Sequence, residues 1–173
     1  MMNDVRRMML SLGSNIAAEV NLPKAVNMLR EIGTVERVSS VWESESVGFE
    51  GPNFLNACVQ FLTPLPPVEF KEKVIRPIEA ALGRVRISEK NAPRTIDIDM
   101  LLYDDQLLNT DFWAYAFVIV PLAELMPGFK HPLSGETLSV FAEQLQVKVW
   151  MRKREDISIY PSGTRSVTVP RRD

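Results

Sequence analysis

The chain has 173 residues, of which 46% are hydrophobic, and a formal net charge of -2 at pH 7. These values suit one compact domain that builds its core without disulfides or a structural metal, and they argue against general affinity for nucleic acids. A single cysteine, Cys58, excludes an intramolecular disulfide and a multi-cysteine zinc site, which is typical of a reducing compartment. Apolar runs of membrane-spanning length are missing from the sequence, so we expect a cytoplasmic protein without a membrane partner.

The first 62 residues alternate strand patterns with one helical pattern. Met8–Leu12 is a short apolar run that predicts a strand. Asn21–Ile32 has apolar residues at helical spacing, and Gly33 is placed to end the helix that this spacing predicts. Val35–Trp42 and Phe54–Leu62 are rich in β-branched and aromatic residues, which predicts two further strands joined by a loop.

A second helix is predicted over Pro66–Leu82, where apolar residues recur four apart. Pro77 lies inside this pattern and should cost about 3 kcal/mol unless the helix kinks, because proline lacks an N–H and its ring clashes with the preceding turn. With the strand that follows, the order β-α-β-β-α-β predicts a ferredoxin-like α+β sandwich. In that fold helices cover one face of an antiparallel sheet, and the other face is left for loops and ligands.

The composition changes after Gln146, where basic residues outnumber acidic ones and Pro161 and Gly163 interrupt any long helix. We therefore expect a domain over residues 1–146 and a basic C-terminal extension over residues 147–173. The extension is either mobile or paired with a sheet edge. A solvated basic segment explains its composition better than a dedicated binding site does.

Asp97 and Asp99 form the most informative pattern in the chain. They lie two residues apart in a β-prone stretch, so their side chains should project from the same face. Neighbouring carboxylates repel each other unless a cation neutralises them, and Mg²⁺ bound by two carboxylates usually completes its coordination with nucleotide phosphates. Arg84, Arg86 and Arg94 precede the pair, and guanidinium groups bind phosphate oxygens. The alternative is an ordinary amphipathic strand with one wet face.

These residues resemble the signature of the 6-hydroxymethyl-7,8-dihydropterin pyrophosphokinase family. The resemblance extends from about Met8 to about Leu145. The motifs that support it are, in chain order, Leu10–Asn15, Ser39–Glu45, Phe54–Ala57, Gly83–Arg86, Ala92–Leu102 and Phe117–Leu125.

The resemblance implies an ATP-dependent enzyme of folate biosynthesis, which transfers pyrophosphate from ATP to the hydroxymethyl group of a reduced pterin and releases AMP. It also implies two Mg²⁺ ions held by Asp97 and Asp99, with Arg84 and Arg94 assisting in catalysis. The implied ATP-binding residues are Arg76, Glu79, Arg84, Arg86, Lys90, Arg94 and Ile98. The implied pterin-binding residues are Ser44, Glu45, Val47, Phe54 and Asn56.

Three features depart from the family pattern. Arg76 stands where a glutamine is usual, and Asn91 replaces an aromatic residue that precedes the signature proline. The segment Asn109–Phe117 looks shorter than its counterpart, which contains a Pro-His pair and an arginine near the phosphates. His131 falls in a separate downstream stretch, so we expect it to be structural rather than a replacement.

Two other classes of function stay open at this point. The chain could be a catalytically weakened protein that still binds nucleotide or pterin, because the departures remove groups that act on the transition state. It could also be an RNA-recognition module, since that module has the same order of elements. The aliphatic strand Met8–Leu12 argues against the second class, because it lacks the aromatic residues on which RNA bases stack.

Overall fold

The computed structural model describes residues 4–46, 50–85 and 93–159. Three residues with predicted binding roles, Val47, Arg86 and Lys90, lie outside these ranges, as does Asn91. The helices and strands are β1 (Arg6–Ser14), α1 (Ala18–Ile32), β2 (Thr34–Val38), β3 (Trp42–Ser44), β4 (Phe54–Thr63), α2 (Pro67–Phe70), a π-helical turn (Lys71–Ile75), α3 (Arg76–Ala81), β5 (Asp97–Tyr103), β6 (Gln106–Leu107), a 3-10 turn (Asp111–Ala114), α4 (Ala116–Leu125), α5 (Leu138–Gln146) and β7 (Met151–Lys153).

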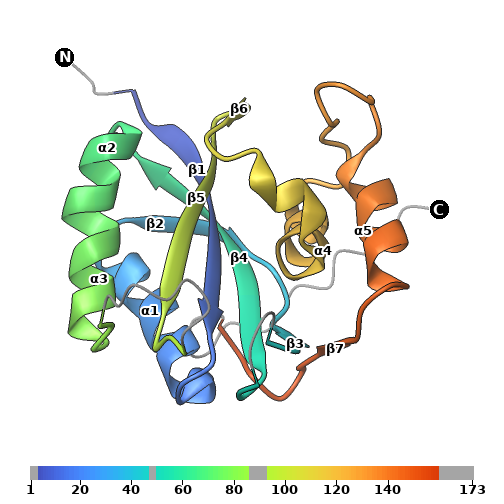
Figure 1. Ribbon diagram of the computed structural model, residues 1–173. Coiled ribbons are helices and arrows are strands. Elements are labelled where there is room, and N and C mark those ends of the chain that lie inside the picture. The colour runs from blue at the N-terminus through green and yellow to red at the C-terminus, as the bar shows by residue number, and fades with distance from the viewer. Residues whose placement is uncertain (1–3, 47–49, 86–92, 160–173) are drawn as a thin grey trace.

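The described strands form one antiparallel sheet in the order β6-β5-β1-β4-β3-β7, and β2 also pairs with β4. Helices α1, α2 and α3 lie on one side of this sheet, as Figure 1 shows. Side chains from alternate positions of β1 and β4, such as Leu10 and Val59, pack against them in the main core. This part of the molecule has the arrangement that the predicted order of elements requires.

The opposite face is not left free, which corrects the expectation of helices on one face only. Helices α4 and α5 lie on that side of the sheet (Figure 1) and form a second core with Met9 and Cys58. Helix α4 is apolar around most of its circumference, and a helix of that kind must be buried on several sides. Its side chains pack over Met9 and Cys58, which lie in the interior of β1 and β4, and Ala116 and Val120 also contact Trp42.

The predicted helix over Pro66–Leu82 is present, but Pro77 does not kink it in the expected way. A π-helical turn, Lys71–Ile75, precedes the proline, and the Arg76 N–H donates to the Lys71 carbonyl five residues back. Pro77 then lies in the first turn of α3, where a missing N–H is tolerated. The helix therefore adapts to proline by a change of hydrogen-bond spacing.

The predicted strand Val35–Trp42 is wrong as a single element, because β2 ends at Val38 and β3 begins at Trp42. Side chains satisfy the backbone in the gap. The Ser39 hydroxyl accepts the N–H of Cys58 at 2.8 Å, and Glu124 Oε2 accepts the N–H of Ser40 at 2.6 Å. No local sequence pattern reveals a partner that lies 84 residues away.

Gly33 ends α1 as predicted, although not through a left-handed conformation. Its N–H donates to the Leu29 carbonyl, and its backbone is extended. A Cβ atom at this position would approach the ring of Phe61 to 2.4 Å. Glycine is therefore required here because the Phe61 ring packs directly on the backbone.

The first part of the C-terminal extension joins the sheet. Strand β7 pairs with β3, and the Arg154 N–H donates to the Val41 carbonyl at 2.8 Å. Ile159 is buried in the main core. Of the two alternatives for the extension, residues 151–153 adopt the edge-pairing one.

Candidate active site

The candidate site begins with a row of paired residues across the sheet. Gly13 on β1 pairs with Asp97 on β5 and with Asn56 on β4, and Asn56 pairs in turn with Trp42 on β3. Residues that pair in this way project from one face, so the predicted metal ligand and the predicted pterin ligand flank the same glycine. A Cβ on Gly13 would lie 3.4 Å from Asn56 Oδ1. The glycine therefore forms an open floor between the two groups.

Asp99 lies one row further along the same face, opposite Ser11. The prediction that Asp97 and Asp99 share a face thus agrees with the strand register. Asp99 is the more exposed of the two carboxylates. Crowding by protein atoms and repulsion from Asp97 raise its pKa to about 6, although Arg94, Arg84 and Lys71 act in the opposite direction.

Two arginines contact the Asp97 carboxylate. Arg84 Nη1 lies 3.0 Å from Asp97 Oδ1, and Arg94 Nη1 lies 2.5 Å from Asp97 Oδ2. Arg84 also forms an ion pair with Glu79, which is buried on α3. Two guanidinium groups therefore accompany three carboxylates, if Asp99 is included, and these five side chains have one net negative charge. This excess of negative charge suits a divalent cation, which can in turn bind phosphate groups.

Glu79 and Ile98, both predicted to bind ATP, are linked to each other in this structure. The Ile98 N–H donates to Glu79 Oε2 at 3.4 Å, and the Ile98 side chain is buried in the main core. Arg76 is exposed and forms an ion pair with Glu72 on the preceding turn. A cavity of about 300 Å³ is lined by Arg76, Glu79, Ala80 and Arg84.

The turn after β1 fixes the backbone beside Arg94. Asn15 Oδ1 accepts the Arg94 N–H at 2.7 Å, and the Asn15 N–H donates to the Arg94 carbonyl at 3.1 Å. The Ser14 hydroxyl donates to the Thr95 carbonyl at 2.6 Å, and the Asn15 side chain also donates to the Pro52 carbonyl at 3.4 Å. The sequence predicts no role for Asn15, which it identifies only as part of the motif Leu10–Asn15. It connects the arginine side of the site to the loop before β4.

The predicted pterin residues gather at the other side of Gly13. Asn56 is 3% exposed, and its Nδ2 atom donates to the Ser44 hydroxyl at 2.8 Å and to the Trp42 carbonyl at 3.3 Å. Phe54 pairs with Ser44 and is half-buried, and Glu45 is exposed just after β3. Three of the predicted residues, Ser44, Phe54 and Asn56, therefore form one surface, with Glu45 at its edge.

The donor set fits a hard divalent cation that shares its coordination with a ligand. Asp97 and Asp99 supply carboxylate oxygens from one face of one strand. Within residues 4–46, 50–85 and 93–159, His, Cys, Asp and Glu side chains form no group of three or more that could hold a metal ion. Water and phosphate oxygens are the usual additional ligands of Mg²⁺ in nucleotide sites.

The segment Asn109–Phe117 is organised by aromatic packing. Phe112 and Trp113 are buried against α4 and α5, and Tyr115 stacks on Phe117 with ring centroids 5.2 Å apart. His131 Nδ1 accepts the N–H groups of residues 133 and 134 and so stabilises a turn. These contacts agree with the expected structural role of His131.

The family model described as 7,8-dihydro-6-hydroxymethylpterin-pyrophosphokinase (HPPK) matches residues 9–127. The chain belongs to this family. It is 35% identical over 153 residues to the 2-amino-4-hydroxy-6-hydroxymethyldihydropteridine pyrophosphokinase of Synechocystis, a match that covers 82% of this chain and 77% of the relative. It is also 35% identical to the Aquifex aeolicus protein of the same name, with 80% and 92% covered.

Solved structures support the fold. A chain of Plasmodium falciparum HPPK-DHPS, crystallised with pteroate, superimposes with a TM-score of 0.64 at 12% sequence identity. The match covers 82% of this chain and 42% of the Plasmodium chain, so the present chain spans less than half of that relative. The predicted pyrophosphokinase family and ferredoxin-like α+β fold are thereby confirmed. The described part of the chain contains no helix with the length and apolar character needed to cross a membrane.

Proposed function

We propose that this HPPK-family chain transfers the pyrophosphoryl group of ATP to the hydroxymethyl oxygen of 6-hydroxymethyl-7,8-dihydropterin and releases AMP. The hydroxymethyl oxygen forms a bond to the β-phosphorus, the bond between that phosphorus and the oxygen bridging to the α-phosphate breaks, and the hydroxyl proton passes to solvent. Such a reaction needs alignment and charge stabilisation more than covalent chemistry from the protein. We also propose a cytoplasmic location, which the buried free thiol of Cys58 suits.

One observation supports this reaction above all others. Asp97 and Asn56 both pair with Gly13, so a phosphate-binding side and a pterin-binding side lie on either flank of one residue. Adjacent strands are about 4.8 Å apart, so the two side chains are separated by roughly 10 Å across the sheet. That span suits a pterin ring at Asn56 whose hydroxymethyl group reaches towards phosphates near Asp97.

On the phosphate side, we propose that Asp97 and Asp99 hold two Mg²⁺ ions. When bound, the ions would neutralise the phosphate oxygens and favour ionisation of the attacking hydroxyl. Arg84 and Arg94 contact Asp97 at 3.0 and 2.5 Å, which supports the proposal that their guanidinium groups bind the phosphates. Glu79 orients Arg84 through their ion pair, and this role is positional rather than catalytic. Arg76, Arg86, Lys90 and Ile98 complete the proposed ATP-binding residues.

On the pterin side, Asn56 would recognise the amide edge of the ring and Phe54 would offer a face for stacking. Asn56 Nδ2 is already fixed by Ser44 and the Trp42 carbonyl. The amide therefore keeps one orientation before the substrate binds. Ser44, Glu45 and Val47 complete the proposed pterin residues.

The test is direct detection of both products. Purified protein is mixed with Mg-ATP and 6-hydroxymethyl-7,8-dihydropterin, and AMP and the pterin pyrophosphate are separated by chromatography. We expect equal amounts of the two products, and none when Mg²⁺ or the pterin is omitted. If calorimetry shows that both ligands bind and no AMP forms, the chain is a binding protein and the proposal is wrong.

A further inference from the structure

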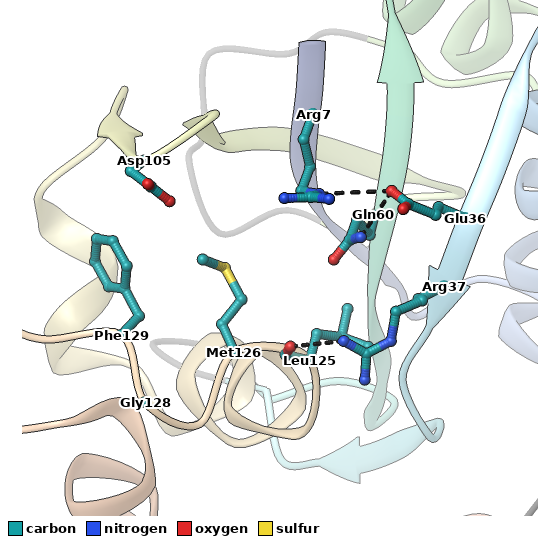
Figure 2. Close-up of a pocket in the computed structure, with 9 residues that line it drawn as sticks. All are labelled: Arg7, Glu36, Arg37, Gln60, Asp105, Leu125, Met126, Gly128 and Phe129. Atoms are coloured by element: carbon teal, nitrogen blue, oxygen red, sulfur yellow. Dashed lines mark hydrogen bonds and ion pairs between the residues drawn. The ribbon is translucent and has the colours of Figure 1, made fainter. Parts of the chain in front are cut away.

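A second cavity, of about 540 Å³, opens at the other end of the sheet face that carries the candidate active site. Figure 2 shows its lining, which includes Arg7 on β1 and Gln60 on β4. Arg7 lies six residues before Gly13 on the same strand, which places the two sites roughly 20 Å apart at 3.3 Å per residue. Helix α4 covers the sheet between them. None of the residues proposed to bind ATP, Mg²⁺ or the pterin lines this cavity.

One carboxylate oxygen holds two of the lining side chains next to each other. Glu36 Oε2 accepts a hydrogen bond from Gln60 Nε2 at 2.8 Å and one from Arg7 Nε at 3.5 Å. The bonds from Gln60 and Arg7 lower the pKa of Glu36, so this carboxylate is ionised at neutral pH. The arginine and the amide are thereby fixed in orientation, as Figure 2 shows.

The remaining hydrogen-bonding atoms of both side chains face the cavity. Gln60 is 5% exposed, and its Oε1 atom points into the cavity in Figure 2. Among the residues that the structure describes, no donor lies within hydrogen-bond distance of that oxygen. The Nη atoms of Arg7 likewise contact no acceptor in the described ranges. An acceptor on a side chain that is 5% exposed thus stands beside the donors of an arginine whose side chain is 48% exposed, and both are accessible to a ligand that enters the cavity.

The opposite wall is apolar and held in place. Leu125, Met126 and Phe129 come from the end of α4 and the turn that follows it, and the Met126 side chain points into the cavity. Arg37 Nη1 donates to the Leu125 carbonyl at 2.9 Å, which attaches this end of α4 to β2. A thioether and an aromatic ring together form a wall that suits a flat ring.

We propose that this cavity is a second ligand site for a small, uncharged, planar molecule with a lactam edge, that is, a ring N–H next to a ring C=O. The N–H would donate to Gln60 Oε1, and the C=O would accept from Arg7. A free phosphate or carboxylate fits less well, because Glu36 and Asp105 balance the charges of Arg7 and Arg37. The ring would lie against Met126 and Phe129.

The probe is 2-pyridone, and its control is 1-methyl-2-pyridone, which keeps the ring and the carbonyl but lacks the N–H. Binding is followed by the NMR signal of the methyl group of Met126 in protein labelled at methionine methyl groups. We expect a saturable shift with 2-pyridone and at least about tenfold weaker binding of the methylated control, the size of effect that one lost buried hydrogen bond produces. Equal affinity for the two probes would overturn the proposal.

Variants separate this cavity from the candidate active site, which could itself accept a lactam. Gln60→Leu and Arg7→Met should each weaken the Met126 response about tenfold or more, whereas Asn56→Ala should leave it unchanged. Thermal unfolding checks that each variant folds. If Gln60→Leu is unfolded, Arg7→Met and the methylated probe still decide the question. A response lost in Asn56→Ala and retained in Arg7→Met would assign the binding to the active site and refute the proposal.

Discussion

Asn15 and Arg94 exchange two hydrogen bonds, one through the asparagine side chain at 2.7 Å and one between the two backbones at 3.1 Å. The turn that ends β1 therefore fixes the backbone of Arg94, whose guanidinium group contacts Asp97. This relationship joins two sequence motifs that lie 79 residues apart. It gives the motif around Gly13 a physical purpose that its residue types alone do not reveal.

The first prediction concerns this contact. Asn15→Ala should lower the free energy of unfolding by about 1–3 kcal/mol, because it leaves the partly buried N–H of Arg94 without its acceptor. It should also raise the KM for ATP more than the KM for the pterin. Urea unfolding and steady-state kinetics measure both effects. Asn27→Ala, a surface change on α1, is the control and should alter neither quantity. Equal rises in the two KM values would argue against a specific role in placing Arg94.

The second prediction concerns the pH dependence of stability without metal. The pKa of Asp99 is raised to about 6 in the folded chain, above its value of about 4 in an unfolded chain. The folded state therefore binds this proton more tightly, and the contribution of Asp99 to stability is lost as pH rises from about 4 to about 6. Asp99→Asn cannot ionise, so it should be more stable than the parent at pH 7.5 and similar at pH 4.

Urea unfolding in EDTA at several pH values measures this difference, and a difference independent of pH would contradict it. The same variant should lose Mg²⁺-dependent ATP binding in calorimetry, because one of two carboxylate ligands is gone. Asp99 is a cleaner choice than Asp97 for this test, since Asp97 also accepts the ion pairs of Arg84 and Arg94. Unchanged affinity for Mg-ATP would mean that Asp99 only faces water.

The third prediction concerns Arg154, which follows β7. Its guanidinium contacts Glu43 on β3 at 2.6 Å and Glu19 on α1 at 2.9 Å. Glu43 in turn accepts a hydrogen bond from Asn53, in the loop that leads to Phe54. Arg154→Ala should therefore raise the KM for the pterin several-fold and change the KM for ATP little.

Arg152→Ala is the matched control for this prediction. Arg152 contacts the same Glu43 oxygen at 3.3 Å, but its side chain is 60% exposed, so its loss should matter much less. Steady-state kinetics with each substrate varied in turn distinguishes the two variants. Identical behaviour of the two would show that the charge of Glu43, rather than the geometry at Arg154, is what matters.

The fourth prediction concerns the floor of the site. Gly13→Ala should fold normally, because the added Cβ would make only a close contact with Asn56 Oδ1 at 3.4 Å and an ordinary one with Phe54 at 3.8 Å. It should nevertheless weaken pterin binding, since the methyl group enters the space between Asp97 and Asn56. Gly128→Ala, where a Cβ has open space, is the control. Calorimetric titration with the pterin tests the comparison, and unchanged affinity in Gly13→Ala would place the substrate elsewhere.

Much of the fold and part of the site follow from local patterns. The spacing of Asp97 and Asp99 on one strand predicts that they share a face, and helical spacing predicts α1 and the helix that contains Glu79. These predictions succeed because the spacing of residues along a strand or a helix decides which of them share a face. The family resemblance then added the grouping of Asn56 and Phe54.

Other features could not be predicted, because they depend on partners far apart in the sequence. The bonds of Glu124 to Ser40 and Trp42 divide a stretch that looks like one strand. Arg154 contacts Glu43 across 111 residues, so composition alone suggests only a solvated basic segment. The placement of α4 on the second face likewise depends on which side of the sheet the chain crosses, and no local period encodes that choice.

The π-helical turn at Lys71–Ile75 has a consequence for how the helix is aimed. A π turn accommodates one residue more than an α-helix does over a similar rise, and each residue of an α-helix turns the chain by about 100°. The π turn therefore takes up one extra residue without changing the direction in which the following residues face. A regular α-helical turn over the same residues would rotate Glu79 by about 100°, away from Arg84 and the Ile98 N–H. The phase of the helix, set one turn earlier, thus determines which residues of α3 face the phosphate side of the site.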